Sequence, residues 1–112
     1  NEKIQGKVTD TALQLANIYD LGNSCYRIGQ LEKANTLFES GLTLAQKTNH
    51  QFYESSFIGY IGMIHAENGK VDLAISYAER ALMIVRKLGN RHGESVFLGN
   101  LSNRYTEKGQ IH

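Results

Sequence analysis

The protein has no proline and a single cysteine among its 112 residues. Proline disrupts helix interiors, so its absence leaves room for uninterrupted helices. Cys25 cannot form an internal disulfide bond, which favours a reducing compartment. No apolar run approaches the roughly 18 residues of a membrane span, and no charged-then-apolar leader opens the chain. We therefore expect a cytoplasmic protein that does not bind membranes.

A charge excess of one sign is also missing. Twelve Lys and Arg residues stand against eleven Asp and Glu residues, giving a net charge of +1 without a block of like charge. Nucleic-acid binders usually present a basic face, so we expect no nucleic-acid partner. The hydrophobic content of 41% is that of a folded domain rather than a disordered chain.

What the sequence does contain is an internal repeat. Gly29, Gly69 and Gly109 are spaced 40 residues apart, and neighbouring segments recur with the same shift. Leu21-Gly22 aligns with Ile61-Gly62 and then with Leu101-Ser102, and Glu54-Ser55-x-Phe57 aligns with Glu94-Ser95-x-Phe97. A fixed period of this size is typical of stacked repeat arrays.

Within each repeat the apolar residues are spaced as on helices. A first helix is expected from about Thr11 to Ile28, with an apolar stripe of Leu15, Ile18, Leu21, Cys25 and Ile28, and a fifth from about Arg91 to Lys108. Gly29, Gly69 and Gly89 are predicted to end helices, and Asn49 and Asn90 to cap the helices that follow. The short connections require antiparallel hairpins. Small residues at Gly22, Gly62, Ala34 and Ala74 allow close helix packing.

The repeats form a single array over residues 1–112. We expect residues 1–8 to be the tail of a preceding helix, 9–48 the first repeat, 49–88 the second, and 89–112 the first helix of a truncated third repeat.

The repeat resembles the tetratricopeptide repeat (TPR). The resemblance rests on Ile18-x-x-Leu21-Gly22-x-x-Cys25-x-x-x-Gly29-x-x-x-x-Ala34-x-x-x-Phe38-x-x-Gly41 and on its counterpart from Ile58 to Ala81. It implies an all-α fold of antiparallel helical hairpins stacked as a right-handed superhelix of about five main helices. The 40-residue period is similar to that of spindle-orientation adaptors and bacterial regulatory TPR proteins. The chain departs from the family at Cys25 and His65, which replace a common aromatic, and lacks the usual proline.

Motifs for chemistry are missing. No phosphate-binding glycine loop, nucleophile elbow or paired-carboxylate motif occurs. His65 and Cys25 occupy a packing position of the repeat, so we interpret both as core residues rather than as a metal ligand and a reactive thiol. We expect no enzyme, cofactor or metal.

The resemblance implies that the first helix of each repeat lines a concave groove that binds a protein or peptide. The groove candidates are Tyr19, Asn23, Tyr26, Ser56, Met63, Asn100 and Asn103. Chaperone C-terminal tails are not expected as ligands, because the positions of the cationic clamp hold no Lys or Arg. The alternative hypothesis is a self-assembly module, a homo-oligomer formed through exposed end helices with Ile4 and Val8 at one end and Phe97, Leu101 and Ile111 at the other.

Overall fold

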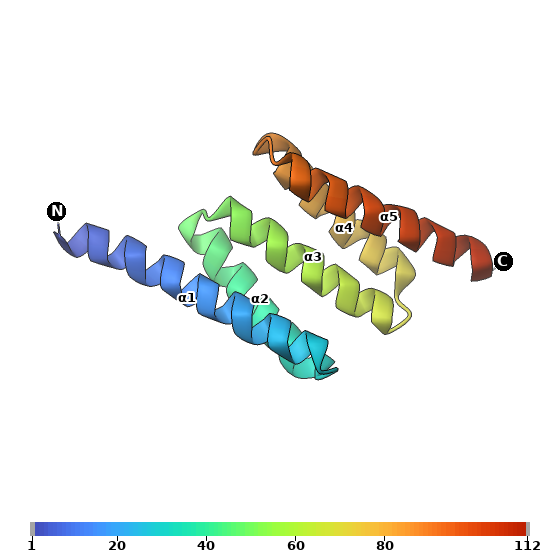
Figure 1. The fold of residues 1–112 in the computed structure, drawn as a ribbon, viewed down its shortest axis with the longest axis horizontal. Coiled ribbons are helices and arrows are strands. Elements are labelled where there is room, and N and C mark those ends of the chain that lie inside the picture. Colours follow the sequence, from blue (N-terminus) through green and yellow to red (C-terminus); the bar gives the residue numbers. More distant parts are fainter. Residues whose placement is uncertain (1, 112) are drawn as a thin grey trace.

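The computed structural model describes the backbone of residues 2–111 and the side chains of residues 10–109. Residues 2–111 form five helices and no strand: α1 (Glu2–Arg27), α2 (Leu31–Thr48), α3 (Gln51–Glu67), α4 (Val71–Lys87) and α5 (Arg91–Ile111). Each helix packs antiparallel on the next, and α1, α3 and α5 form one layer in front of α2 and α4 (Figure 1). The predicted all-α solenoid is confirmed.

Each reversal of the chain uses the same hydrogen bond. The residue after the left-handed one donates its N–H to a carbonyl five residues back, at Gln30–Cys25, His50–Ala45, Lys70–His65 and Asn90–Val85, each 2.9 Å long. This is the bond of a Schellman cap, which needs a residue with positive φ just before the donor. Gly29, Gly69 and Gly89 supply that residue, as predicted, with φ of 84°, 80° and 69°.

Asn49 does not cap the start of α3, so the prediction of an N-cap at this residue is wrong. It adopts a φ of 61° and ends α2, because asparagine tolerates the left-handed region that glycine supplies at the other three reversals. The residue before α3 is His50, whose side chain makes no capping bond. Asn90 does cap its helix, since its Oδ1 accepts the Gly93 N–H at 3.0 Å.

The outer helices extend beyond their predicted bounds. α1 begins at Glu2 instead of near Thr11, so it runs through the segment that the repeat alignment gives to a preceding helix. α5 continues to Ile111 through Gly109, because glycine permits a left-handed residue without imposing one. The division into repeats stays a prediction.

The core consists of two clusters that meet at α3. Phe57, Ile61 and Ile64 of α3 pack with α1 and α2, whereas Ile58 packs with α4 and α5. Close packing depends on small residues, as predicted: a Cβ at Gly22 would lie 2.5 Å from the Phe38 ring, and one at Gly62 would lie 2.9 Å from the Tyr77 Cβ. α3 therefore buries both of its flanks.

The exposure of two groups of apolar residues differs from the prediction. Leu21 and Ile28 of the expected α1 stripe are exposed, because no helix of the described chain covers that flank of α1. Phe97 and Leu101, expected on an exposed end face, are buried against α3 and α4 at positions equivalent to Phe57 and Ile61. The side chains of Ile4, Val8 and Ile111 lie outside the described part of the chain.

Candidate functional site: the groove along the inner helices

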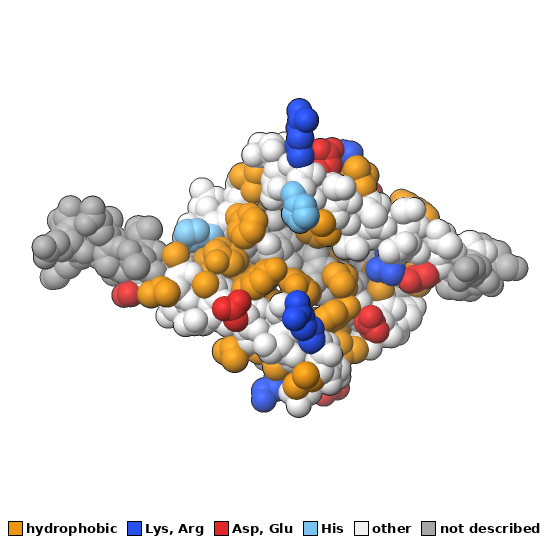
Figure 2. Space-filling model, in the orientation of Figure 1, with side chains coloured by type: hydrophobic (Ala, Val, Ile, Leu, Met, Phe, Trp, Pro, Cys, Tyr) orange, Lys and Arg blue, Asp and Glu red, His pale blue; other side chains and the backbone are white. Residues whose placement is uncertain are grey.

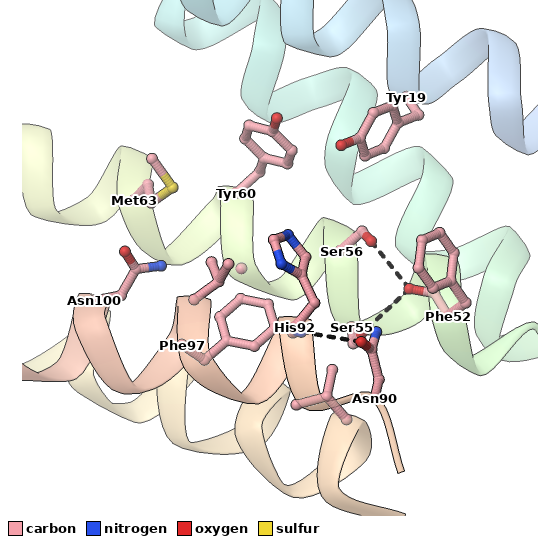
Figure 3. Close-up of a pocket in the computed structure, with 14 residues that line it drawn as sticks. Tyr19, Phe52, Ser55, Ser56, Tyr60, Met63, Asn90, His92, Phe97 and Asn100 are labelled. Atoms are coloured by element: carbon pink, nitrogen blue, oxygen red, sulfur yellow. Dashed lines mark hydrogen bonds between the residues drawn. The ribbon is translucent and has the colours of Figure 1, made fainter. Parts of the chain in front are cut away.

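A cavity of about 270 Å³ opens between α1, α3 and the first half of α5. Tyr19 projects toward it from α1, whereas Phe97 and Asn100 project from α5 on the other side of α3 (Figure 3). Hydrophobic side chains gather in the hollow between these helices on the face seen in Figure 2. We call this space the apolar cavity; its lining residues are Tyr19, Phe52, Ser55, Ser56, Gly59, Tyr60, Met63, Val85, Asn90, His92, Gly93, Val96, Phe97 and Asn100.

A network of aromatic rings forms the α1 side of the apolar cavity. Tyr19 meets the rings of Tyr53 and Tyr60 edge-on, at centroid distances of 6.2 and 5.7 Å. Tyr60 in turn stacks on Phe38 of α2 at 4.6 Å. Edge-to-face and offset-stacked contacts at such distances are attractive, so they hold these rings in place before any ligand binds.

The Tyr60 hydroxyl is fixed by α1. It donates to Asn23 Oδ1 at 3.1 Å, and burial raises the pKa of Tyr60 to about 12. The phenol therefore stays a hydrogen-bond donor at neutral pH. Asn23 lines neither cavity, so its bond positions the Tyr60 side chain.

On the α3 and α5 side, two glycines let neighbouring side chains of the cavity wall pack directly on the backbone. Gly59 has no side chain, and the Phe97 ring occupies the space where a Cβ would stand. Gly93 lies in the first turn of α5, and a Cβ there would lie 2.9 Å from Val85 Cγ1. The hydroxyls of Ser55 and Ser56 both donate to the Phe52 carbonyl, at 2.8 and 3.0 Å (Figure 3). These serines therefore shape the α3 backbone and do not offer a free donor.

A second cavity of about 360 Å³ continues along the same helices toward the ends of α3 and α5. Its lining residues are Tyr26, Met63, Ala66, Glu67, Asn100, Asn103, Arg104 and Glu107. We call it the polar cavity. Met63 and Asn100 line both cavities, so the two form one continuous groove.

Charged groups dominate the polar cavity. Arg104 Nε and Nη2 donate to the two oxygens of Glu107 at 3.0 and 2.7 Å, a bidentate ion pair within α5. The Tyr26 hydroxyl donates to Glu67 Oε1 across α1 and α3 at 3.4 Å. Burial, and next the charge of Glu67, raise the pKa of Tyr26, so this hydroxyl also remains protonated.

The structure brings the predicted groove residues together. Tyr19, Ser56, Met63 and Asn100 line the apolar cavity, and Tyr26, Met63, Asn100 and Asn103 line the polar one. Asn23 lies behind the wall through its bond to Tyr60. That these residues bind a peptide stays a prediction.

Sequence reasoning missed several lining residues. Phe52 and His92 stand 40 residues apart at the starts of α3 and α5, and Glu67 and Glu107 stand 40 apart near their ends. The repeat shift pairs these positions, so extending it beyond the family motif identifies them. The Arg104–Glu107 pair follows only from the coordinates.

His65 lies outside this groove. Its ring packs 5.2 Å from the Tyr77 ring, as expected of a core residue in an aromatic position. Burial, and next the nearby Lys70, lower the pKa of His65, whereas Glu39 opposes them. Its Nδ1 is buried without a hydrogen-bond partner. Asn35 Oδ1 is also buried without a partner, and the two residues line a small cavity near the start of α2.

The described residues form neither a metal-ion site nor a membrane span. No group of three or more His, Cys, Asp or Glu side chains there is placed to hold a metal ion. No helix in that part of the chain has the length and apolar character to cross a membrane.

Comparison with known proteins supports the fold through a similar solved structure. No protein-family model and no curated protein matches the sequence. The TPR domain of Arabidopsis FLU is similar in structure, with a TM-score of 0.81 and 27% sequence identity over 88% of this chain and 83% of that domain. The chain has a TPR-type fold. The predicted 40-residue subclass is untested by this likeness and stays a prediction.

Proposed function

We propose that the chain is a protein-interaction module that binds a peptide segment of a partner in the groove between α1, α3 and α5. The observation that carries the proposal is the continuity of the two cavities through Met63 and Asn100. Together they provide apolar surface for ligand side chains and amides for a ligand backbone. The TPR-type fold supports interaction with a protein partner in general.

The aromatic wall favours binding because it is held in place by the protein itself. Tyr19 and Tyr60 are fixed by ring contacts and by the Asn23 bond, so a ligand does not have to order them. Preorganised walls of this kind retain more of the contact energy as affinity. Phe52 and Val96 add exposed apolar surface at the same cavity.

The test compares two matched variants in a random-peptide selection. Val96 and Leu98 lie on α5 with the same 44% exposure, but only Val96 lines the apolar cavity. Val96→Glu places a charge in the groove and should abolish enrichment of the selected peptides. Leu98→Glu, with the same change on another flank of the helix, should leave enrichment intact. Equal enrichment on both variants would contradict groove binding.

Self-assembly is the second candidate function, and one observation favours it. Leu21 and Leu98 are 58% and 44% exposed, whereas their repeat equivalents Ile61 and Ile58 are fully buried. Uncovered apolar flanks of this kind can pair between chains. This candidate predicts a mass above one chain by light scattering, reduced by Leu98→Glu and unchanged by Val96→Glu. A monomer at all concentrations would exclude it.

A further inference from the structure

The two cavities of the groove differ in chemistry, and this difference restricts the ligand. The apolar cavity is walled by Tyr19, Tyr60, Val96 and Phe97. It suits an aliphatic or aromatic side chain, because such a side chain removes apolar surface on both partners from water. This inference rests on the proposed groove function and concerns the identity of the ligand.

The polar cavity has one carboxylate without a cation partner. Arg104 uses both oxygens of Glu107, so that pair is neutralised within α5. Glu67 has a long hydrogen bond from the Tyr26 hydroxyl, and its side chain is exposed to the cavity. The lining residues therefore carry one net negative charge, from two glutamates and one arginine.

The neighbouring cations do not cancel that charge from within the cavity. Arg27 is the repeat equivalent of Glu67, 40 residues earlier, but it lines neither cavity. Lys108, next to Glu107, pairs with Asp72 of α4 at 2.9 Å. A cationic ligand side chain is thus the one that complements the polar cavity.

The spacing of the cavities sets the spacing of the two ligand side chains. The apolar cavity uses residues 52–63 of α3 and 92–100 of α5, and the polar cavity uses residues 63–67 and 100–107. At about 1.5 Å per helical residue, the midpoints lie roughly 11 Å apart along the groove on both helices. An extended polyproline-II segment rises about 3.1 Å per residue and repeats its side-chain direction every third residue, so positions i and i+3 span roughly 9 Å on one face, the same-face spacing nearest to that separation.

The amides of Asn100 and Asn103 favour an extended ligand over a helical one. They follow each other on α5 at the junction of the cavities and within the polar cavity. An extended backbone leaves its N–H and C=O groups free to bond such amides, whereas a helix uses them internally.

We propose that the groove selects an extended peptide segment with an apolar side chain in the apolar cavity and a lysine or arginine three residues away, facing Glu67. The cation lies on one side of the anchor only, since the polar cavity continues the groove in a single direction.

The test uses acetylated and amidated peptides with one leucine or phenylalanine anchor. Arg, Gln or Glu is placed three residues before or after the anchor, and affinity is measured by fluorescence anisotropy at low and high salt. In one orientation the Arg peptide should bind about threefold to tenfold more tightly than the Glu peptide, with the preference reduced by salt. The Gln peptide should fall between them.

Charge reversal in the protein identifies the group responsible. Glu67→Lys should invert the preference, so that the Glu peptide binds more tightly than the Arg peptide. The matched control is Glu79→Lys, an equally drastic change at an exposed glutamate of α4 that lines none of the cavities described above. It should leave the preference unchanged.

The outcomes separate this inference from the proposed function. If anchored peptides bind, lose affinity with Val96→Glu, and show no charge preference, groove binding stands and the cation inference is wrong. A preference that survives Glu67→Lys also overturns it. If no anchored peptide binds at all, the proposed function and the inference fail together.

Discussion

Two repeat positions that are buried in α3 are each exposed in one of the outer helices. Ile61 is fully buried between α1 and α2, whereas its equivalent Leu21 is 58% exposed on α1. Ile58 is fully buried against α4 and α5, whereas its equivalent Leu98 is 44% exposed on α5. A repeat residue is thus buried by its neighbours in the stack rather than by its own identity, and among α1, α3 and α5 only α3 packs extensively against two other helices, α2 and α4.

The largest expected effect separates Ile61 from Leu21. Ile61→Ala should lower the free energy of unfolding by about 2–5 kcal/mol, because it leaves a cavity in a packed cluster. Leu21→Ala should change it by less than about 1 kcal/mol, since most of that side chain already contacts water. Urea unfolding monitored by circular dichroism measures both. Equal losses would show that α1 is covered in solution.

A smaller difference is expected between two equivalent glycines, Gly59 and Gly99. A Cβ at Gly59 would overlap the buried Phe97 ring, whereas one at Gly99 meets nothing within 4 Å. Gly59→Ala should therefore cost about 1–2 kcal/mol after the helix-propensity gain, and Gly99→Ala should stabilise by up to about 1 kcal/mol. Thermal unfolding of the two variants gives the signs. Stabilisation by Gly59→Ala would mean that α5 does not pack as described.

The smallest expected effect is a pH dependence at the end of α3. Because the pKa of His65 is lowered in the folded chain, the unfolded chain binds this proton more readily. Stability should therefore be highest above the ordinary histidine pKa of 6.5 and should fall as the pH drops from there through the folded-state pKa. His65→Phe keeps a ring against Tyr77 and should make the decline shallower. Parallel pH curves for the two proteins would contradict the assignment.

The sequence predicted the repeat, the hairpins and the glycine reversals, because these depend on local spacing and on single backbone conformations. It mispredicted Asn49, since asparagine suits both an N-cap and a left-handed C-cap. It also misplaced Phe97 and Leu101, whose burial depends on how α5 packs against its neighbours.

The groove was predicted in outline but not in chemistry. The inner-helix positions followed from the repeat, and all seven lie in or directly behind the two cavities. The division of the groove into an apolar and a polar part depends on the Arg104–Glu107 pair and on the Tyr60–Asn23 bond. These contacts join side chains whose relative positions the sequence does not specify.

The most direct test of groove binding is an NMR titration of the isotope-labelled chain with a selected peptide. The account predicts that the amide signals of Gly59, Gly93, Asn100 and Asn103 shift with one saturating affinity, because these residues line the groove. The signals of Gly29 and Gly89, at the reversals, should stay in place. Shifts confined to Leu98 and its neighbours, or to the outer helices α2 and α4, would contradict the account.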